Sequence, residues 1–208
     1  MKDKKVFLQV SLLIFIKIVT YSSVSFACSA FVSTRENQIL IGNNEDYPSQ
    51  FKDVVVRIRP PEGKYYGRLM IGFNQQSFSM GGINDQGLLY DSFSVPECKW
   101  RRNREKKKVF KNFKLDDILG SCATVEEVIA FCKRYNMMYF INNQLFVVDK
   151  SGKAAVISWG ETDVEVTWLK KDYQAVTNFF LQHPERGTLQ LSGKVAAPCP
   201  RYEWIEKH

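Results

Sequence analysis

Short apolar runs separated by clusters of turn residues dominate the chain from residue 28 onward. Residues 28–34 and 38–44 are two such runs, and the polar segment 35–37 joins them, which is the pattern of a β-hairpin. The segment 80–87 is rich in glycine and polar residues and is predicted to form a turn. Further strands are predicted at 54–59, 67–73, 87–93 and 173–180, and a meander of three strands is predicted over 144–169.

One segment has helical periodicity instead. Within 124–135, Thr124 and Glu127 have the spacing of a capping box, which marks a helix N-terminus. Four apolar residues share one face of this predicted helix: Val125, Val128, Ile129 and Cys132. A second helix is predicted to begin within the tail 199–208.

Strands outnumber helices in this pattern, and the turns between the strands are short. Short connections favour antiparallel sheets, because parallel strands need longer crossovers. Two sheets facing each other, with helices outside, would bury the apolar runs. The sequence therefore predicts an α+β sandwich in one domain over residues 28–208, and the 45% hydrophobic content fits a globular domain.

The net charge of +7 is divided unevenly along the chain. Residues 1–27 contribute +3, since they hold four lysines and one aspartate, and the remainder contributes +4. A charge of this size does not indicate a nucleic-acid partner. The segment 99–114 carries nine basic residues and one acidic residue, Glu105. It is interpreted as a solvated surface loop, with contact to an anionic surface or substrate as the alternative.

Residues 1–27 have the features of a secretory signal peptide. Three early lysines precede an apolar stretch over 6–16, and Ser25 and Ala27 stand at the positions that a signal peptidase reads. A membrane span needs about 20 apolar residues, whereas Lys17 interrupts this stretch after 11 residues. We therefore expect cleavage after Ala27, a secreted or periplasmic location, and no stable membrane insertion of the mature chain.

Cleavage after Ala27 would make Cys28 the first of 181 mature residues. Bacterial lipoproteins also begin with cysteine, but Ser25 and Phe26 stand where their signal normally has leucine and a small residue. A non-enzymatic exported protein, with Cys28 lipidated or disulfide-bonded, is the alternative to an enzyme. The other cysteines are even in number and can pair in an exported protein, although their spacing indicates neither a zinc site nor one pairing: Cys98, Cys122, Cys132 and Cys199.

A thiol attacks a carbonyl group as thiolate, so Cys28 needs a base or a lowered pKa. The chain has two histidines: His208 is the last residue, and His183 lies in a polar loop, so a Cys28–His183 pair is one option. A first-residue cysteine also brings its own base, because the α-amino group has an ordinary pKa of about 7.7–8. The short tether between amine and thiol lowers the entropic cost of bringing the two groups together. Nucleophiles of this kind are a known variant of the catalytic triad.

The stretch CSAFVS…ILIGNNEDYP resembles the start of the choloylglycine hydrolase and penicillin V acylase group of N-terminal nucleophile hydrolases, which cleave linear amide C–N bonds. Four later segments resemble family segments in the same order: 81–91, 147–159, 175–180 and 199–204. The resemblance implies an αββα sandwich of two antiparallel sheets. It also implies an exported amidohydrolase without metal or cofactor, acting on a small N-acyl amide such as a bile-acid conjugate or a penicillin V type compound. A homo-oligomer is left open.

The resemblance also implies roles for individual residues. Cys28 matches the nucleophile and supplies the α-amino base, and Asp46 matches the aspartate that holds the amine and thiol in place. Asn178 matches the side chain that donates to the developing oxyanion. The loss of one such donor typically costs about 100- to 1,000-fold in rate. Arg201 matches an arginine that supports the polar network of the nucleophile.

The sequence departs from the family pattern at two of these places. The family usually has arginine after the glycine at 42, where this chain has the uncharged Asn43. Ser94, or a neighbour, takes the place of a second oxyanion asparagine. Both departures indicate a divergent branch with another acyl substrate. The chain also ends seven residues after Arg201, so we expect a domain incomplete at its C-terminus, and a degenerate inactive member is a further alternative.

Overall fold

A computed structural model gives the fold of the chain. It describes residues 28–35, 38–46, 53–74, 79–103, 105, 109–110, 115–189, 195–196 and 199–207. The predicted leader 1–27 and half of the basic segment 99–114 lie outside the described residues.

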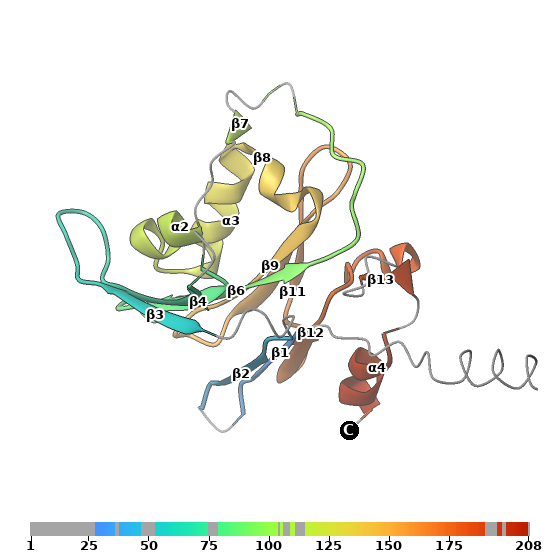
Figure 1. Cartoon of the computed structure of the whole chain (residues 1–208), viewed down its shortest axis with the longest axis horizontal. Helices are drawn as coiled ribbons and strands as arrows, with labels where there is room; N and C mark the ends of the chain where they lie inside the picture. The colour runs from blue at the N-terminus through green and yellow to red at the C-terminus, as the bar shows by residue number, and fades with distance from the viewer. Residues whose placement is uncertain are drawn as a thin grey trace, which may run out of the picture.

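Two antiparallel sheets form the centre of the molecule (Figure 1). The larger has seven strands in the order β11-β10-β9-β6-β5-β4-β3, and the smaller has three in the order β12-β1-β2. The large sheet consists of β3 (Val54–Arg59), β4 (Arg68–Phe73), β5 (Gly81–Asn84), β6 (Leu89–Ser94), β9 (Asn143–Val148), β10 (Ala154–Trp159) and β11 (Val164–Trp168). The small sheet consists of β1 (Ser29–Ser33), β2 (Leu40–Asn44) and β12 (Tyr173–Val176).

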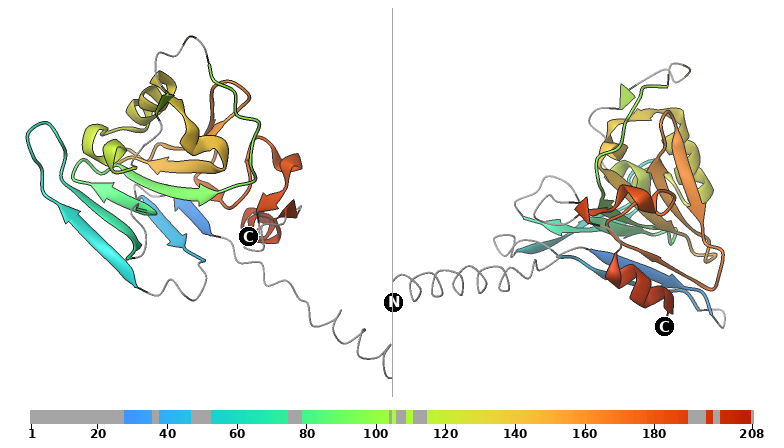
Figure 2. Two further views of the ribbon diagram at one scale, coloured as in Figure 1. Left: turned by 45° about the horizontal axis from the view of Figure 1, so that its top comes forward. Right: turned by 90° about the vertical axis from the view of Figure 1, so that its right-hand side faces the viewer.

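The helices lie outside the two sheets (Figures 1 and 2). Helices α2 (Leu115–Ser121) and α3 (Val125–Arg134) cover one face of the large sheet, and α4 (Pro200–Lys207) contacts β12 of the small sheet. The remaining described elements are short: β7 (Val109–Phe110), β8 (Asn136–Met137), η1 (Met138–Ile141), η2 (Pro184–Arg186), β13 (Thr188–Leu189) and β14 (Val195–Ala196). The predicted sandwich of two antiparallel sheets with outer helices is therefore confirmed.

Two apolar clusters hold these layers together. One fills the space between the large sheet and the helices, and the other fills the space between the two sheets. The second cluster depends on alternation along β1, whose Ala30 and Val32 point inward while Phe31 is 40% exposed. Cys28 belongs to this inter-sheet cluster, together with Phe93 and Phe146 of the large sheet. The candidate nucleophile is thus part of the packing that joins the sheets.

Helix α3 begins as its capping pattern predicts. Thr124 Oγ1 accepts a hydrogen bond from the Glu127 backbone N–H at 3.3 Å. Glu127 Oε2 in turn accepts from the Ala123 backbone N–H at 2.6 Å, one residue earlier than in the usual capping box. Asp149, in the turn between β9 and β10, accepts from the Val125 backbone N–H at 3.1 Å and ties this helix end to the sheet. The four predicted apolar residues of the helix are buried.

The prediction of a turn over 80–87 is wrong in its first half, because Gly81–Asn84 form strand β5. The glycines there serve close packing: a Cβ on Gly82 would lie 2.5 Å from the Leu69 carbonyl oxygen of β4. The turn itself is confined to Asp85–Gly87. Helix α2 was not predicted, because its seven residues give too short a pattern to recognise. No helix among the described residues is long and apolar enough to cross a membrane.

Candidate active site

The strand register places Cys28 between two polar side chains. The β1–β2 pairing, continued one residue beyond Ser29, brings Glu45 opposite Cys28. The β1–β12 pairing, continued two residues beyond Ala30, brings Asn178 opposite Cys28 on the other side. Cys28 is only 7% exposed, so its thiol lies in the interior between these neighbours.

Glu45 contacts the thiol directly. Cys28 Sγ donates a hydrogen bond to Glu45 Oε2 at 2.9 Å, and Asn43 Nδ2 donates to Glu45 Oε1 at 3.1 Å. The side chains of Asn43 and Glu45 share one face because side chains alternate along a strand. Glu45 was not among the site residues predicted from the sequence. The available signal was its position two residues after Asn43, at the end of the predicted hairpin.

The surroundings of the thiol disfavour its charged form. Burial raises the pKa of the Cys28 thiol well above its usual range, and the negative charge of Glu45 raises it further. A hydrogen bond from the Asp46 backbone N–H lowers the pKa of the same thiol, but by less. Burial also raises the pKa of Glu45, while the hydrogen bonds from Cys28 and Asn43 lower it. In the uncleaved chain the thiol is therefore protonated at neutral pH, and a protonated thiol must lose its proton in any attack.

Asp91 of β6 adds a second carboxyl group beside Glu45. Asp91 is 3% exposed, and its Oδ1 accepts from the Ser92 backbone N–H at 2.9 Å. Its Oδ2 is buried without a hydrogen bond of normal geometry within the described part of the chain. Burial raises the pKa of Asp91 well above its usual range, and the negative charge of Glu45 raises it further. Burial and the charge of Glu45 therefore favour the protonated form of Asp91.

Asp46 and Arg201, two predicted site residues, form an ion pair. Arg201 Nη1 of α4 donates to Asp46 Oδ2 at 3.1 Å, and Asn44 Nδ2 donates to Asp46 Oδ1 at 3.0 Å. The backbone N–H of Asp46 reaches Cys28, as described above. The carboxylate that accepts a hydrogen bond from the sulfur belongs to Glu45, which precedes Asp46 in the chain.

Asn178 and Ser94, the two predicted oxyanion positions, also lie together. Asn178 Nδ2 donates to the Ser94 backbone carbonyl at 2.8 Å, and Asn178 is 5% exposed. An asparagine amide has two N–H groups, so one of them is left for an oxyanion. Ser94 takes part in this contact through its backbone carbonyl, whereas a role for its hydroxyl was predicted from the sequence. The residue itself is exposed.

His183 is engaged elsewhere. Its Nε2 lies 2.8 Å from Glu165 Oε2, and its Nδ1 lies 3.2 Å from Glu185 Oε1. Both ring nitrogens therefore have carboxylate partners, and the alternative of a Cys28–His183 pair is wrong. All five cysteines are described and none forms a disulfide, so the disulfide alternative for Cys28 finds no partner there. The described residues contain no group of three side chains that could hold a metal ion.

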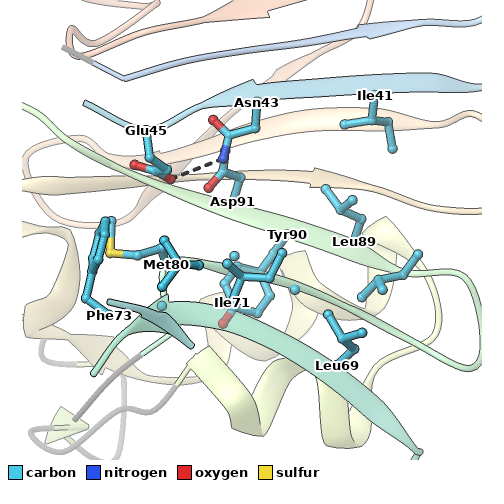
Figure 3. A pocket seen from close by; sticks show the side chains of 15 residues that line it. Ile41, Asn43, Glu45, Leu69, Ile71, Phe73, Met80, Leu89, Tyr90 and Asp91 are labelled. Atoms are coloured by element: carbon cyan, nitrogen blue, oxygen red, sulfur yellow. Dashed lines mark hydrogen bonds between the residues drawn. The ribbon is translucent and has the colours of Figure 1, made fainter. Parts of the chain in front are cut away.

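A cavity of about 400 Å³ opens beside this polar group, between β2 and the large sheet (Figure 3). Asn43, Glu45 and Asp91 gather at one end of it, where they point toward one another (Figure 3). The rest of the lining is largely apolar and comes mainly from β4, β5 and β6: Leu69, Ile71, Phe73, Met80, Ile83 and Leu89. The cavity can hold an apolar group of moderate size, and Glu45 at its polar end joins it to the Cys28 thiol, which is not itself part of the lining.

The chain belongs to a family of acyl-transferring enzymes. The model of the family described as acyl-coenzyme A:6-aminopenicillanic acid acyl-transferase matches residues 33–192, which is most of the chain. The matched range includes Glu45, Asp46 and Asn178 but neither Cys28 nor Arg201. A comparison with curated proteins found no match.

The fold is similar to those of two solved hydrolases. Penicillin V acylase from Agrobacterium tumefaciens has 18% identity and a TM-score of 0.51, over 76% of this chain and 55% of that one. A mutant of conjugated bile acid hydrolase from Clostridium perfringens has 18% identity and a TM-score of 0.55, over 74% and 53%. The resemblance inferred from the sequence is thereby confirmed. The chain spans about half the length of these two proteins.

Proposed function

We propose that this chain is a cysteine N-terminal nucleophile amidohydrolase that cleaves a linear amide C–N bond of a small N-acyl substrate. One observation carries the proposal. In a chain of this family, Cys28 is buried between Glu45 and Asn178, next to the polar end of a largely apolar cavity. The apolar lining suits an acyl group, and the thiol lies near the end where its carbonyl carbon would stand. Compounds of the penicillin V and bile-acid conjugate types are the first substrates to test, because hydrolases named for them share the fold.

The proposed reaction passes through an acyl-enzyme. The Cys28 thiol gives its proton to a neighbouring base as its sulfur attacks the amide carbonyl, and Asn178 Nδ2 together with a backbone N–H stabilises the oxyanion. The α-ammonium group of Cys28 protonates the leaving amine as the C–N bond breaks. Water then attacks the thioester, and the free α-amine takes the proton from that water. The Asp46–Arg201 pair fixes the β2 end that carries the Asp46 N–H to the sulfur.

This mechanism needs a free amine, and Cys28 follows Ala27 in the encoded sequence. Cleavage of the predicted signal peptide after Ala27 would create the amine during export, and the mature chain would act outside the cytoplasm. N-terminal sequencing and intact mass of exported protein test this step. A mature chain beginning at any other residue contradicts the proposal, and a diacylglyceryl mass on Cys28 identifies a lipoprotein instead.

Turnover of a panel of N-acyl amides by wild type and by Cys28→Ser tests the nucleophile. We expect Cys28→Ser to lose at least about 100-fold in kcat/KM, since the serine hydroxyl is far less readily deprotonated than a thiol. Cys98→Ser is the matched control, because Cys98 is also 7% exposed and free but lies in the other apolar cluster. Turnover that survives Cys28→Ser unchanged would count against the proposal, and no turnover of any amide would favour a degenerate member.

A further inference from the structure

Glu45 has no role in the reaction as proposed so far, yet it is the carboxylate that the structure places on the nucleophile. Its Oε2 accepts the Cys28 thiol hydrogen at 2.9 Å. The Asn43 side chain holds the other carboxylate oxygen at 3.1 Å, which fixes the orientation of the group. Glu45 also lines the cavity, so it faces the space in which a substrate would lie (Figure 3).

We propose that Glu45 is a catalytic residue that accepts the thiol proton of Cys28 as the sulfur attacks the substrate carbonyl. This inference rests on the proposed function and adds a residue to it. The geometry required of a general base is already present, because a base must lie within hydrogen-bond distance of the proton that it removes.

The charges around the thiol favour proton transfer during attack over a preformed thiolate. A free thiolate would stand beside the negative charge of Glu45 in a buried site, and like charges at such a distance repel strongly. The α-ammonium group of mature Cys28 offsets part of this repulsion, but Asn43 adds no further cation. When the proton moves to Glu45 as the S–C bond forms, the carboxyl group becomes neutral and the second negative charge never appears.

The proton count of the whole cycle balances. In acylation, the Cys28 S–H bond breaks, its proton goes to the Glu45 carboxylate, and the sulfur bonds to the carbonyl carbon. The C–N bond then breaks as the α-ammonium group gives a proton to the leaving nitrogen. In deacylation, water gives a proton to the α-amine and its hydroxyl to the acyl carbon, while the leaving sulfur takes back the proton from Glu45. The enzyme returns to its starting state without an oxidant, reductant or metal.

Burial and two acidic neighbours influence the pH range in which Glu45 can act as a base. Asp91 faces Glu45 from β6. Asp46 follows Glu45 in the chain, and the negative charge of Asp46, which is paired with Arg201, raises the pKa of Glu45. Cys28, which immediately precedes β1, donates its thiol hydrogen to Glu45. Because burial is the largest influence and raises the pKa of Glu45, its proton-accepting form should be lost at a higher pH than that of an ordinary glutamate.

Acylation of Cys28 by p-nitrophenyl acetate isolates the proposed step, because p-nitrophenolate leaves without being protonated. The burst of p-nitrophenolate is followed from about pH 4 to 9 in wild type, Glu45→Gln and Glu45→Asp, and the acetylated residue is located by mass spectrometry. We expect Glu45→Gln to acylate at least about 100-fold more slowly and to lose the acidic limb of the profile. Glu45→Asp should recover part of the rate, since it keeps the carboxylate.

Alkylation of Cys28 by iodoacetamide gives a readout of opposite sign. Glu45→Gln removes a negative charge that raises the pKa of the thiol, so the thiolate fraction rises and alkylation at about pH 8–9 becomes faster. Slower acylation together with faster alkylation in Glu45→Gln supports the role of Glu45 as a general base. Acylation that is unchanged or faster in Glu45→Gln would overturn it. Glu62→Gln, which removes an exposed glutamate outside the cavity lining, should match wild type in both assays.

These assays separate the failure of this inference from the failure of the proposed function. A wild-type protein that is acetylated at Cys28 but hydrolyses no amide would contradict the proposed function, and the Glu45 variants would still decide the role of Glu45. Absence of any acetylation at Cys28 in wild type would overturn both. Thermal unfolding of each variant shows whether a lost rate reflects lost folding.

Discussion

The two strands that flank β1 bring different chemistry to Cys28. On the β12 side stands Asn178, a neutral amide at the position that the family resemblance implies for an oxyanion donor. On the β2 side stands Glu45, an acidic group in contact with the thiol, next to Asn43 where the family usually has arginine. One flank keeps the expected pattern, and the other replaces a cation by a neutral amide and presents a carboxylate to the sulfur.

The comparison separates two requirements of acyl transfer. Stabilising the oxyanion needs a fixed donor next to the carbonyl oxygen, which leaves little choice of side chain. Removing the thiol proton can be done by any base of suitable pKa within reach, so this task can pass to a different residue. The β12 flank therefore serves oxyanion stabilisation, which restricts the choice of side chain. The β2 flank serves removal of the thiol proton, which different bases can perform.

The largest effect is expected on the β12 flank, from Asn178→Ala. It removes the proposed oxyanion donor, so acylation of Cys28 by p-nitrophenyl acetate should slow by about 100- to 1,000-fold. Alkylation by iodoacetamide forms no oxyanion and should change little. An equal loss in both reactions would show that Asn178 holds the site in shape through its bond to the Ser94 carbonyl, and would contradict the oxyanion role.

The acidic groups on the β2 flank, Glu45 and its neighbour Asp91, should make folding stability depend on pH. Burial raises the pKa values of Glu45 and Asp91, so the folded state binds protons more tightly than the unfolded state. Stability contributed by these groups therefore increases as the pH falls toward their unfolded values, and decreases as the pH rises through their folded values. This sign is opposite to that of carboxylates stabilised by ion pairs.

Asp91→Asn tests that sign, because it keeps the shape of the side chain and removes one of the two acids. We expect a higher urea midpoint than wild type at about pH 8, and a loss of about half of the stabilisation on going from about pH 8 to about pH 5. Asp53→Asn, at an exposed position just before β3, should leave the pH profile as in wild type. If Asp91→Asn is less stable than wild type at the higher pH, the raised pKa values assigned to Glu45 and Asp91 are contradicted.

The sequence was enough to predict the sandwich, because alternation and short turns specify antiparallel strands locally. The family resemblance indicated Cys28, Asp46, Asn178 and Arg201 as site residues, and the structure places them in one region. The sequence did not reveal Glu45, because the choice between neighbouring acids at 45 and 46 depends on which of them lies opposite Cys28, and that is decided by the register of the β1–β2 hairpin. Asp91 was equally hidden, since its proximity to Glu45 arises only when the two sheets stack.

The smallest effect is expected from Ser94→Ala, at the place where the sequence indicated a substitute oxyanion donor. The contact to Asn178 uses the Ser94 backbone carbonyl, which alanine retains, and the residue is exposed. Acylation and amide turnover should therefore stay within about 2-fold of wild type, as for other exposed substitutions. A loss approaching that of Asn178→Ala would instead make the Ser94 hydroxyl a second donor. The β12 flank would then provide two oxyanion contacts, and the division of tasks between the two flanks of Cys28 would be sharper still.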